Sequence, residues 1–180
     1  MPPTAKQVFK GKIFEVYQWE QEMYDGSTET FEALKRPNTI EVIATQGDKI
    51  LMSRQSQPNK HNFLSLFGGR AEEGEETLET AKRELLEESG LSSTDWELFK
   101  MYEPASKIEW KVFTYIARNC EKVSEPKLDP GEKIETISCS FEEFIDLVQD
   151  DAYWGTEFTL DVLKMKVAGK LDAFKKQLFG

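Results

Sequence analysis

The sequence predicts an α/β domain in which strands and helices form layers, and three observations support this class. From Gln7 to Leu34, β-forming side chains alternate with polar ones, which is typical of strands. From Glu75 to Glu88, and again from Glu157 to Leu178, apolar residues recur at helical spacing. Strands flanked by several helices form a layered α/β domain.

The first strands form an N-terminal β segment. Tyr24-Asp25-Gly26-Ser27 supplies turn residues between two of its strands. Arg36-Pro37-Asn38 ends the segment, because proline lacks a backbone N–H and restricts the residue before it. The 180 residues contain no repeat or long linker, and this length suits one domain. We therefore expect a single domain over residues 1–180, with an N-terminal β segment at 1–36 and a core at 37–180.

The core elements follow in order along the chain. Gly47-Asp48 marks a turn between two strands, and residues 58–62 are predicted to form a polar loop. The helix that starts near Glu75 ends at Gly90, a C-terminal cap. Ser140 opens another helix with a capping box, since Glu143 follows three residues later. The expected core strands are Thr39–Ala44, Lys49–Met52, Trp96–Tyr102 and Trp110–Ala117.

Charge and composition exclude some classes of function. The net charge of −10 argues against non-specific nucleic-acid binding, which needs a basic face. No apolar run approaches the roughly 20 residues that span a membrane, and residues 1–12 lack the apolar stretch of a signal peptide. Cys120 and Cys139 lie in apolar surroundings, which favours buried reduced thiols over a disulfide. We expect a cytoplasmic protein without a membrane or nucleic-acid partner.

The acidity is concentrated in one segment, Gly69 to Leu91. This segment has an excess of five negative charges, which is half of the net charge of the chain. Its eight acidic residues are Glu72, Glu73, Glu75, Glu76, Glu79, Glu84, Glu87 and Glu88, and its three basic residues are Arg70, Lys82 and Arg83.

Helical spacing puts three of these carboxylates on one side of the predicted helix. Glu84 lies three positions before Glu87 and four before Glu88, and like charges at such spacing destabilise a bare helix. A hard divalent cation with oxygen ligands, Mg²⁺ or Mn²⁺, would reverse that effect. Arg83 lies one turn before Glu87 and can hold a carboxylate, while Gly68 and its neighbour Gly69 allow the backbone, including a carbonyl ligand, to approach closely. The alternative is a solvated acidic face, the usual meaning of a charge run.

The full pattern of the segment favours the metal site over the solvated acidic face. The segment fits G-x5-E-x7-R-E-U-x-E-E-x-G-U, with U apolar, at every defined position, and thereby resembles the Nudix hydrolases. A random match in such a chain is on the order of one in a million. The matching residues are Gly69, Glu75, Arg83, Glu84, Leu85, Glu87, Glu88, Gly90 and Leu91.

The resemblance implies an α/β/α sandwich with a mixed sheet and an N-terminal β-rich extension. It implies hydrolysis of a nucleoside diphosphate linked to another moiety, with Mg²⁺ or Mn²⁺ as cofactor. Glu84, Glu87 and Glu88 are then metal ligands, with Gly68 beside them, and Glu75 and Arg83 support them. The expected catalytic group is Arg83, Glu87, Glu88 and Glu132.

The rest of the chain resembles the ADP-ribose pyrophosphatase branch. In that branch, N-terminal strands build a homodimer and a downstream acidic loop supplies a catalytic glutamate; Glu132 is favoured here over Glu135. The expected substrate is ADP-ribose or a related nucleotide sugar. Two alternatives stay open: hydrolysis of nucleoside triphosphates or dinucleoside polyphosphates, and a Nudix module that binds a nucleotide without cleaving it.

The candidate substrate-binding residues are Arg54, Phe67 and Arg70. Arg54 can bind a phosphate or merely end a strand. Aromatic residues can stack on a base, although aromatics at strand spacing more often lie in a core; the candidates are Tyr17, Trp19, Phe67 and Trp110. His61 lies in a polar loop and is expected at the surface.

Overall fold

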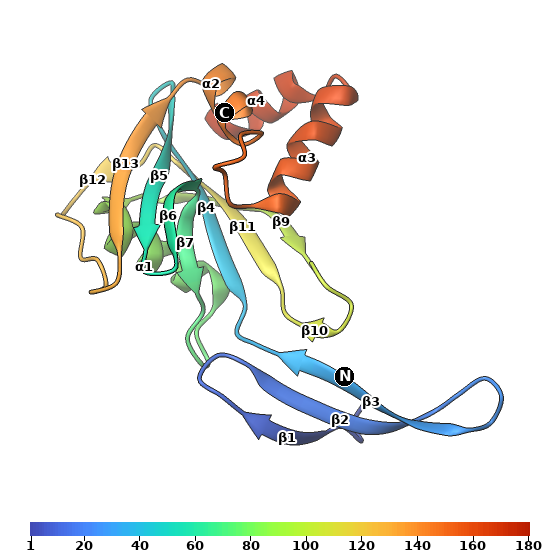
Figure 1. Ribbon diagram of the computed structural model, residues 1–180. Coiled ribbons are helices and arrows are strands. Elements are labelled where there is room, and N and C mark those ends of the chain that lie inside the picture. Colours follow the sequence, from blue (N-terminus) through green and yellow to red (C-terminus); the bar gives the residue numbers. More distant parts are fainter.

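The computed structural model describes residues 1–180 (Figure 1). Its helices are α1 (Thr77–Ser89), α2 (Phe141–Leu147), α3 (Thr156–Val167) and α4 (Leu171–Phe179). Its strands are β1 (Lys6–Lys10), β2 (Glu15–Glu22), β3 (Thr28–Lys35), β4 (Thr39–Gln46), β5 (Lys49–Gln57), β6 (Lys60–Ser65), β7 (Phe67–Arg70), β8 (Leu91–Ser92), β9 (Asp95–Tyr102), β10 (Ile108–Glu109), β11 (Val112–Arg118), β12 (Glu121–Lys122) and β13 (Lys133–Cys139).

The central sheet has the order β13-β5-β4-β11-β9, with β6 paired to β5 and β7 paired to β4. Only β4 and β11 run parallel, so the sheet is mixed. Helix α1 covers one face of this sheet, and α2, α3 and α4 cover the other (Figure 1). This α/β/α sandwich confirms the predicted fold class.

Strand alternation divides the core into two apolar clusters. Ile40 and Val42 of β4 pack with Leu85 of α1, whereas Ile43 packs with Phe158 of α3. Side chains of neighbouring strand residues point to opposite faces, so one strand serves both clusters. A polar residue in β4 therefore lies under either α1 or the C-terminal helices.

The N-terminal sheet projects away from the sandwich (Figure 1). Its order is β1-β2-β3-β10, and β10 joins β3 in parallel. The β2–β3 hairpin turns where the sequence predicts it, with Gly26 at a φ of 83°. Within β1, β2 and β3, only Ala33 is fully buried. This sheet thus makes little core of its own.

Two predicted elements differ in the structure, and one strand was not predicted. The polar loop at 58–62 shrinks to a short turn, because Gln57 already pairs with Lys60 and β6 begins there. The C-terminal helical stretch is two helices, separated at Gly169, whose φ of 65° suits a glycine. Strand β13, which no sequence signal marked, pairs along the whole of β5's edge from Cys139 to Lys133.

Both cysteines are buried and free, as predicted, and burial raises the pKa of each thiol to about 11. None of the four helices is long and apolar enough to cross a membrane.

Candidate active site

Helix α1 presents the acidic residues of the motif. Its inner face buries Ala81 and Leu85, and it ends at Gly90, which adopts the left-handed conformation with a φ of 70°. The backbone N–H of Gly90 donates to the carbonyl of Leu86 at 2.8 Å. The predicted helix and its glycine cap are confirmed, although the helix begins at Thr77 rather than near Glu75.

Two glycines on β7 bring the backbone against the carboxylates of α1. The N–H of Gly68 donates to Oε2 of Glu88 at 2.8 Å. A Cβ atom added to Gly69 would lie 2.5 Å from Oε1 of Glu84, and one added to Gly68 would overlap the carbonyl of Ile40. Side chains at either position would therefore push the strand away from the acidic cluster.

Four carboxylates gather beside these glycines: Glu84, Glu87, Glu88 and Glu132. Burial raises the pKa of Glu88 well above its ordinary value; the Gly68 N–H opposes this, and the charges of Glu84, Glu132 and Glu87 add to it. Burial also raises the pKa of Glu84 and of Glu132. The structure thus brings Glu132 to the helix cluster, while Glu135 of β13 pairs with Arg54 of β5 at 3.8 Å, and both of these side chains are exposed.

Arg83 ties the motif carboxylates together. Its Nε and Nη2 donate to the two oxygens of Glu75 at 2.9 and 3.0 Å. Its Nη1 donates to Oε1 of Glu84 at 2.9 Å and to Oε2 of Glu87 at 3.0 Å. This pairing lowers the pKa of Glu75 to about 2. Arg83 thereby orients three carboxylates, the supporting role implied by the resemblance.

The donor set suits a hard divalent cation. Carboxylate and carbonyl oxygens are the ligands that Mg²⁺ and Mn²⁺ prefer. In this structure no three acidic side chains converge as a ligand shell; Arg83 instead occupies Glu84 and Glu87. Glu84, Glu88 and Glu132, whose pKa values are raised by burial, thus lie with Glu87 in one cluster of oxygen ligands that fits a metal.

The three candidate substrate residues lie in different environments. Arg54 and Arg70 are exposed, and the carbonyl of Arg70 accepts from Arg83 at 3.3 Å. Phe67 is wholly buried, because its side chain points to the α1 face of the sheet beside Ile40 and Val42. It has no free face for a base, so the prediction that Phe67 binds substrate is wrong.

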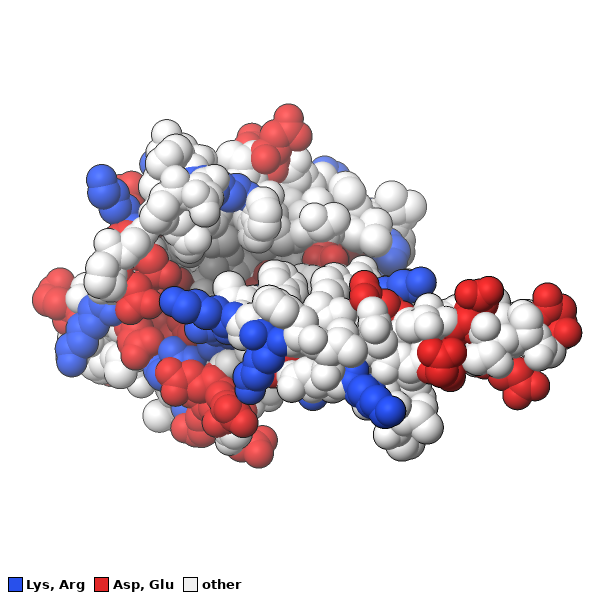
Figure 2. Space-filling view, turned by 60° about the horizontal axis from the view of Figure 1, so that its bottom comes forward, with Lys and Arg blue, Asp and Glu red and all other residues white.

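A cleft of about 990 Å³ separates the N-terminal sheet from the loop that leads into α1. Its lining includes Arg36, Trp110 and residues 71–75. Figure 2, in which the bottom of Figure 1 comes forward, shows a hollowed face, with acidic side chains to its left and Lys and Arg side chains along its lower rim.

Arg36 is the cleft residue that sequence reasoning missed. Its guanidinium lies 4.6 Å from the ring centroid of Trp110 and donates to Oγ1 of Thr39 at 3.2 Å. It has no carboxylate partner, and burial and the charge of Arg70 lower its pKa. Two neighbouring, unpaired guanidiniums attract an anion. The signal was present in Arg36-Pro37, which we interpreted only as the end of a strand.

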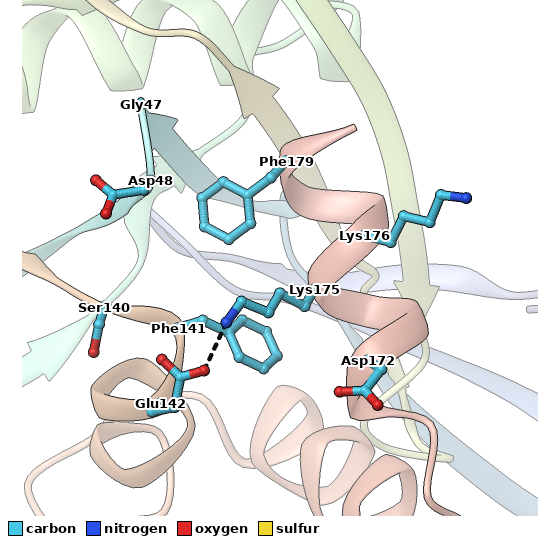
Figure 3. Close-up of a pocket in the computed structure, with 9 residues that line it drawn as sticks. All are labelled: Gly47, Asp48, Ser140, Phe141, Glu142, Asp172, Lys175, Lys176 and Phe179. Atoms are coloured by element: carbon cyan, nitrogen blue, oxygen red, sulfur yellow. Dashed lines mark hydrogen bonds and ion pairs between the residues drawn. The ribbon is translucent and has the colours of Figure 1, made fainter.

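A second cavity, of about 580 Å³, lies between the β4–β5 turn and the C-terminal helices (Figure 3). Lys175 pairs there with Glu142 at 2.6 Å, and its ammonium lies 5.2 Å from the ring centroid of Phe141. No residue of the motif lines it. The acidic cluster and the larger cleft therefore define the candidate active site.

Comparison with known proteins defines the class. The NUDIX domain family matches residues 35–160, which is more than half of the chain. The protein belongs to the Nudix family, as a Nudix hydrolase.

Individual relatives indicate which branch of the family the chain resembles. The chain is 27% identical over 171 residues to the ADP-ribose pyrophosphatase of Bacillus subtilis (strain 168), with 92% of each chain covered. It is 25% identical over 163 residues to the methanol dehydrogenase activator of Bacillus methanolicus, with 88% of each covered. The crystal structure of an ADP compounds hydrolase has the same fold, with a TM-score of 0.73, 20% identity, and 93% and 95% of the two chains covered. The predicted resemblance to the ADP-ribose pyrophosphatase branch is confirmed.

Proposed function

We propose that the protein hydrolyses the pyrophosphate bond of ADP-ribose, or of a related nucleoside diphosphate sugar, to a nucleoside monophosphate and a sugar phosphate. The observation that carries this proposal is the complete motif on α1, whose carboxylates gather beside Gly68 and Gly69. The relative with the printed name ADP-ribose pyrophosphatase supports the choice of substrate, since it matches over almost the whole chain.

Mg²⁺ or Mn²⁺ is the proposed cofactor. Glu84, Glu87, Glu88 and the carbonyl of Gly68 would hold it. When bound, such a cation polarises the phosphoryl oxygens and offsets the charge that develops on the leaving group.

The chain's own residues would then act on water and substrate. Glu132, whose pKa is raised by burial, would accept a proton from the water whose oxygen attacks phosphorus. The P–O bond to the leaving phosphate breaks, and its electron pair stays with that phosphate. Arg83 keeps Glu84 and Glu87 in place throughout.

The cleft offers a place for the substrate's negative charge. Arg36 and Arg70 lack carboxylate partners, the charge of Arg70 acts on Arg36, and Arg36 lines the cleft together with the loop that enters α1. Guanidinium groups bind phosphate with paired hydrogen bonds. We assign phosphate binding to this pair, with Arg54 of β5 as a more remote contributor.

A panel of nucleotides with identified products tests this function. The panel contains ADP-ribose, other nucleotide sugars, nucleoside triphosphates and dinucleoside polyphosphates, each with Mg²⁺ and with Mn²⁺. We expect ADP-ribose or a nucleotide sugar to be cleaved fastest. Absence of any metal-dependent product across the panel would falsify the proposal, and faster triphosphate cleavage would move the protein to another branch.

We also propose a cytoplasmic homodimer formed through the N-terminal sheet. This sheet exposes the apolar side chains Val8, Phe9, Ile13 and Phe14, which a partner subunit would cover. Sedimentation at micromolar concentration should give twice the mass of one chain. A monomer there would contradict the dimer.

A further inference from the structure

A group of polar side chains, called the recess below, lies beside α3 on the face of the central sheet opposite α1. Glu41 stands in β4 between Ile40 and Val42, which both pack toward α1. Its side chain therefore points to the other face, where its charge and the charges of Glu157 and Asp161 of α3 all act on Tyr102. Burying a carboxylate is costly unless it is hydrogen-bonded or paired.

Glu41 has little compensation in this recess. Its one hydrogen bond is from Oγ1 of Thr114 at 3.2 Å, and no lysine or arginine pairs with it. Burial raises its pKa to about 7. By contrast, Asp161 accepts from the Tyr102 hydroxyl at 2.9 Å and from Lys100. Glu41 thus keeps acceptor capacity, whereas Asp161 is already paired.

Tyr153 supplies the matching donor. Its hydroxyl is buried and has no hydrogen-bond partner, and the charge of Glu41 contributes to its raised pKa. The backbone on either side of Tyr153 is held by two hydrogen bonds to Leu64. The Leu64 N–H donates to the carbonyl of Ala152 at 2.8 Å, and the Trp154 N–H donates to the carbonyl of Leu64 at 2.7 Å. A fixed, buried hydroxyl without a partner is expensive, and a bound ligand would explain it.

The recess adjoins the proposed active site through β4. Glu41 pairs across the β4–β7 ladder with Gly68, whose N–H holds Glu88. Thr39, two residues earlier in β4, lies on the same face and accepts from Arg36 and Trp110. These two positions on one strand are about 7 Å apart, a separation that one nucleotide spans.

We propose that the recess formed by Glu41, Tyr153 and Tyr102 reads the nucleobase of the substrate. Its acidic groups repel phosphate, so the ligand part that fits is neutral and carries N–H donors. A nucleobase edge presents such a donor beside an acceptor, for Glu41 and the Tyr153 hydroxyl respectively. This inference rests on the proposed function and adds to it where the base binds.

The test compares two substrates that differ only at the base edge, ADP-ribose and its hypoxanthine analogue. The quantity is the ratio of their kcat/KM values in the wild type, Glu41→Gln and Tyr153→Phe. We expect a clear preference in the wild type, and a ratio reduced about tenfold in both variants, mainly through KM. Tyr24→Phe is the matched control, because Tyr24 is fully exposed, and it should keep the wild-type ratio.

Thermal unfolding separates a binding role from a structural one. Tyr153→Phe removes an unpaired buried hydroxyl, so its Tm should equal or exceed that of the wild type. A wild type without base preference, or two folded variants that keep the wild-type ratio, would overturn the inference. If the wild type cleaves no nucleotide, the proposed function fails. Calorimetry with adenosine and inosine then tests base binding by itself, and equal binding by the wild type and Tyr153→Phe would overturn the inference that the recess binds the base.

Discussion

Arg83 and Glu75 form the best-defined ion pair of the motif. The two hydrogen bonds from the Arg83 guanidinium to the Glu75 carboxylate are 2.9 and 3.0 Å long. Both side chains are largely shielded, since 27% of the Arg83 side chain and 18% of the Glu75 side chain are exposed. The folded-state pKa of Glu75, about 2, lies below its ordinary value of 4.5. The pair therefore stabilises the fold above pH 4.5, and this contribution is lost as the pH falls toward 2.

Glu75→Gln should consequently destabilise the protein at pH 7 by about 1 kcal/mol. Urea unfolding of wild type and variant at pH 7 and near pH 3 measures this, and the difference should shrink at the lower pH. Glu79→Gln is the control, because the Glu79–Lys82 pair is exposed. An equal difference at both pH values would show that charge is not the cause.

The ionisation of Glu88 affects stability in the opposite direction to that of Glu75. Its folded pKa is raised, so its ionisation opposes folding as the pH rises above the ordinary carboxyl range. Glu88→Gln should stabilise the metal-free protein at pH 7, since the amide oxygen can still accept from Gly68. It should also lower hydrolysis about 100-fold or more. Calorimetric unfolding in chelator measures the stability, and a parallel assay measures the activity. A variant that is less stable than the wild type, or one that is fully active, would contradict this account.

At the scale of elements, the junction of β7 with α1 determines the site. The Nudix motif predicted α1 and its cap because helical spacing and the glycine are local features. Strand β13 depends on pairing across distant parts of the chain, so no local pattern marked it. Glu132 was expected in the site only from the family resemblance, because its approach to α1 also depends on that pairing. Phe67 was misassigned for a similar reason: the face to which a strand residue points is decided by the sheet.

Gly69→Ala tests this junction. The added methyl group would lie 2.5 Å from Glu84, so the carboxylate must move, and activity should fall about tenfold or more while the fold persists. Gly47→Ala, at a φ of 59° with no atom within 4 Å, supplies backbone strain without such contact. That control should lose stability and keep activity. Full activity of Gly69→Ala would mean that close approach of β7 is dispensable.

At the scale of the whole molecule, the sandwich and the N-terminal sheet enclose the larger cleft between them. Composition and the motif predicted the fold class and the acidic cluster. They did not predict the pairing of Arg36 with Trp110, or the recess under α3, because these unite residues from several strands and a helix. Function in this protein thus depends on one local motif and on contacts that only the folded chain creates.

The most direct test is hydrolysis of ADP-ribose by wild type and Glu88→Gln, with Mg²⁺ and with chelator, and with products separated by chromatography. We predict AMP and ribose 5-phosphate from the wild type with Mg²⁺ alone. Chelator or Glu88→Gln should each remove most of the product. Cleavage that persists in chelator, or that Glu88→Gln leaves intact, would contradict a metal site on α1.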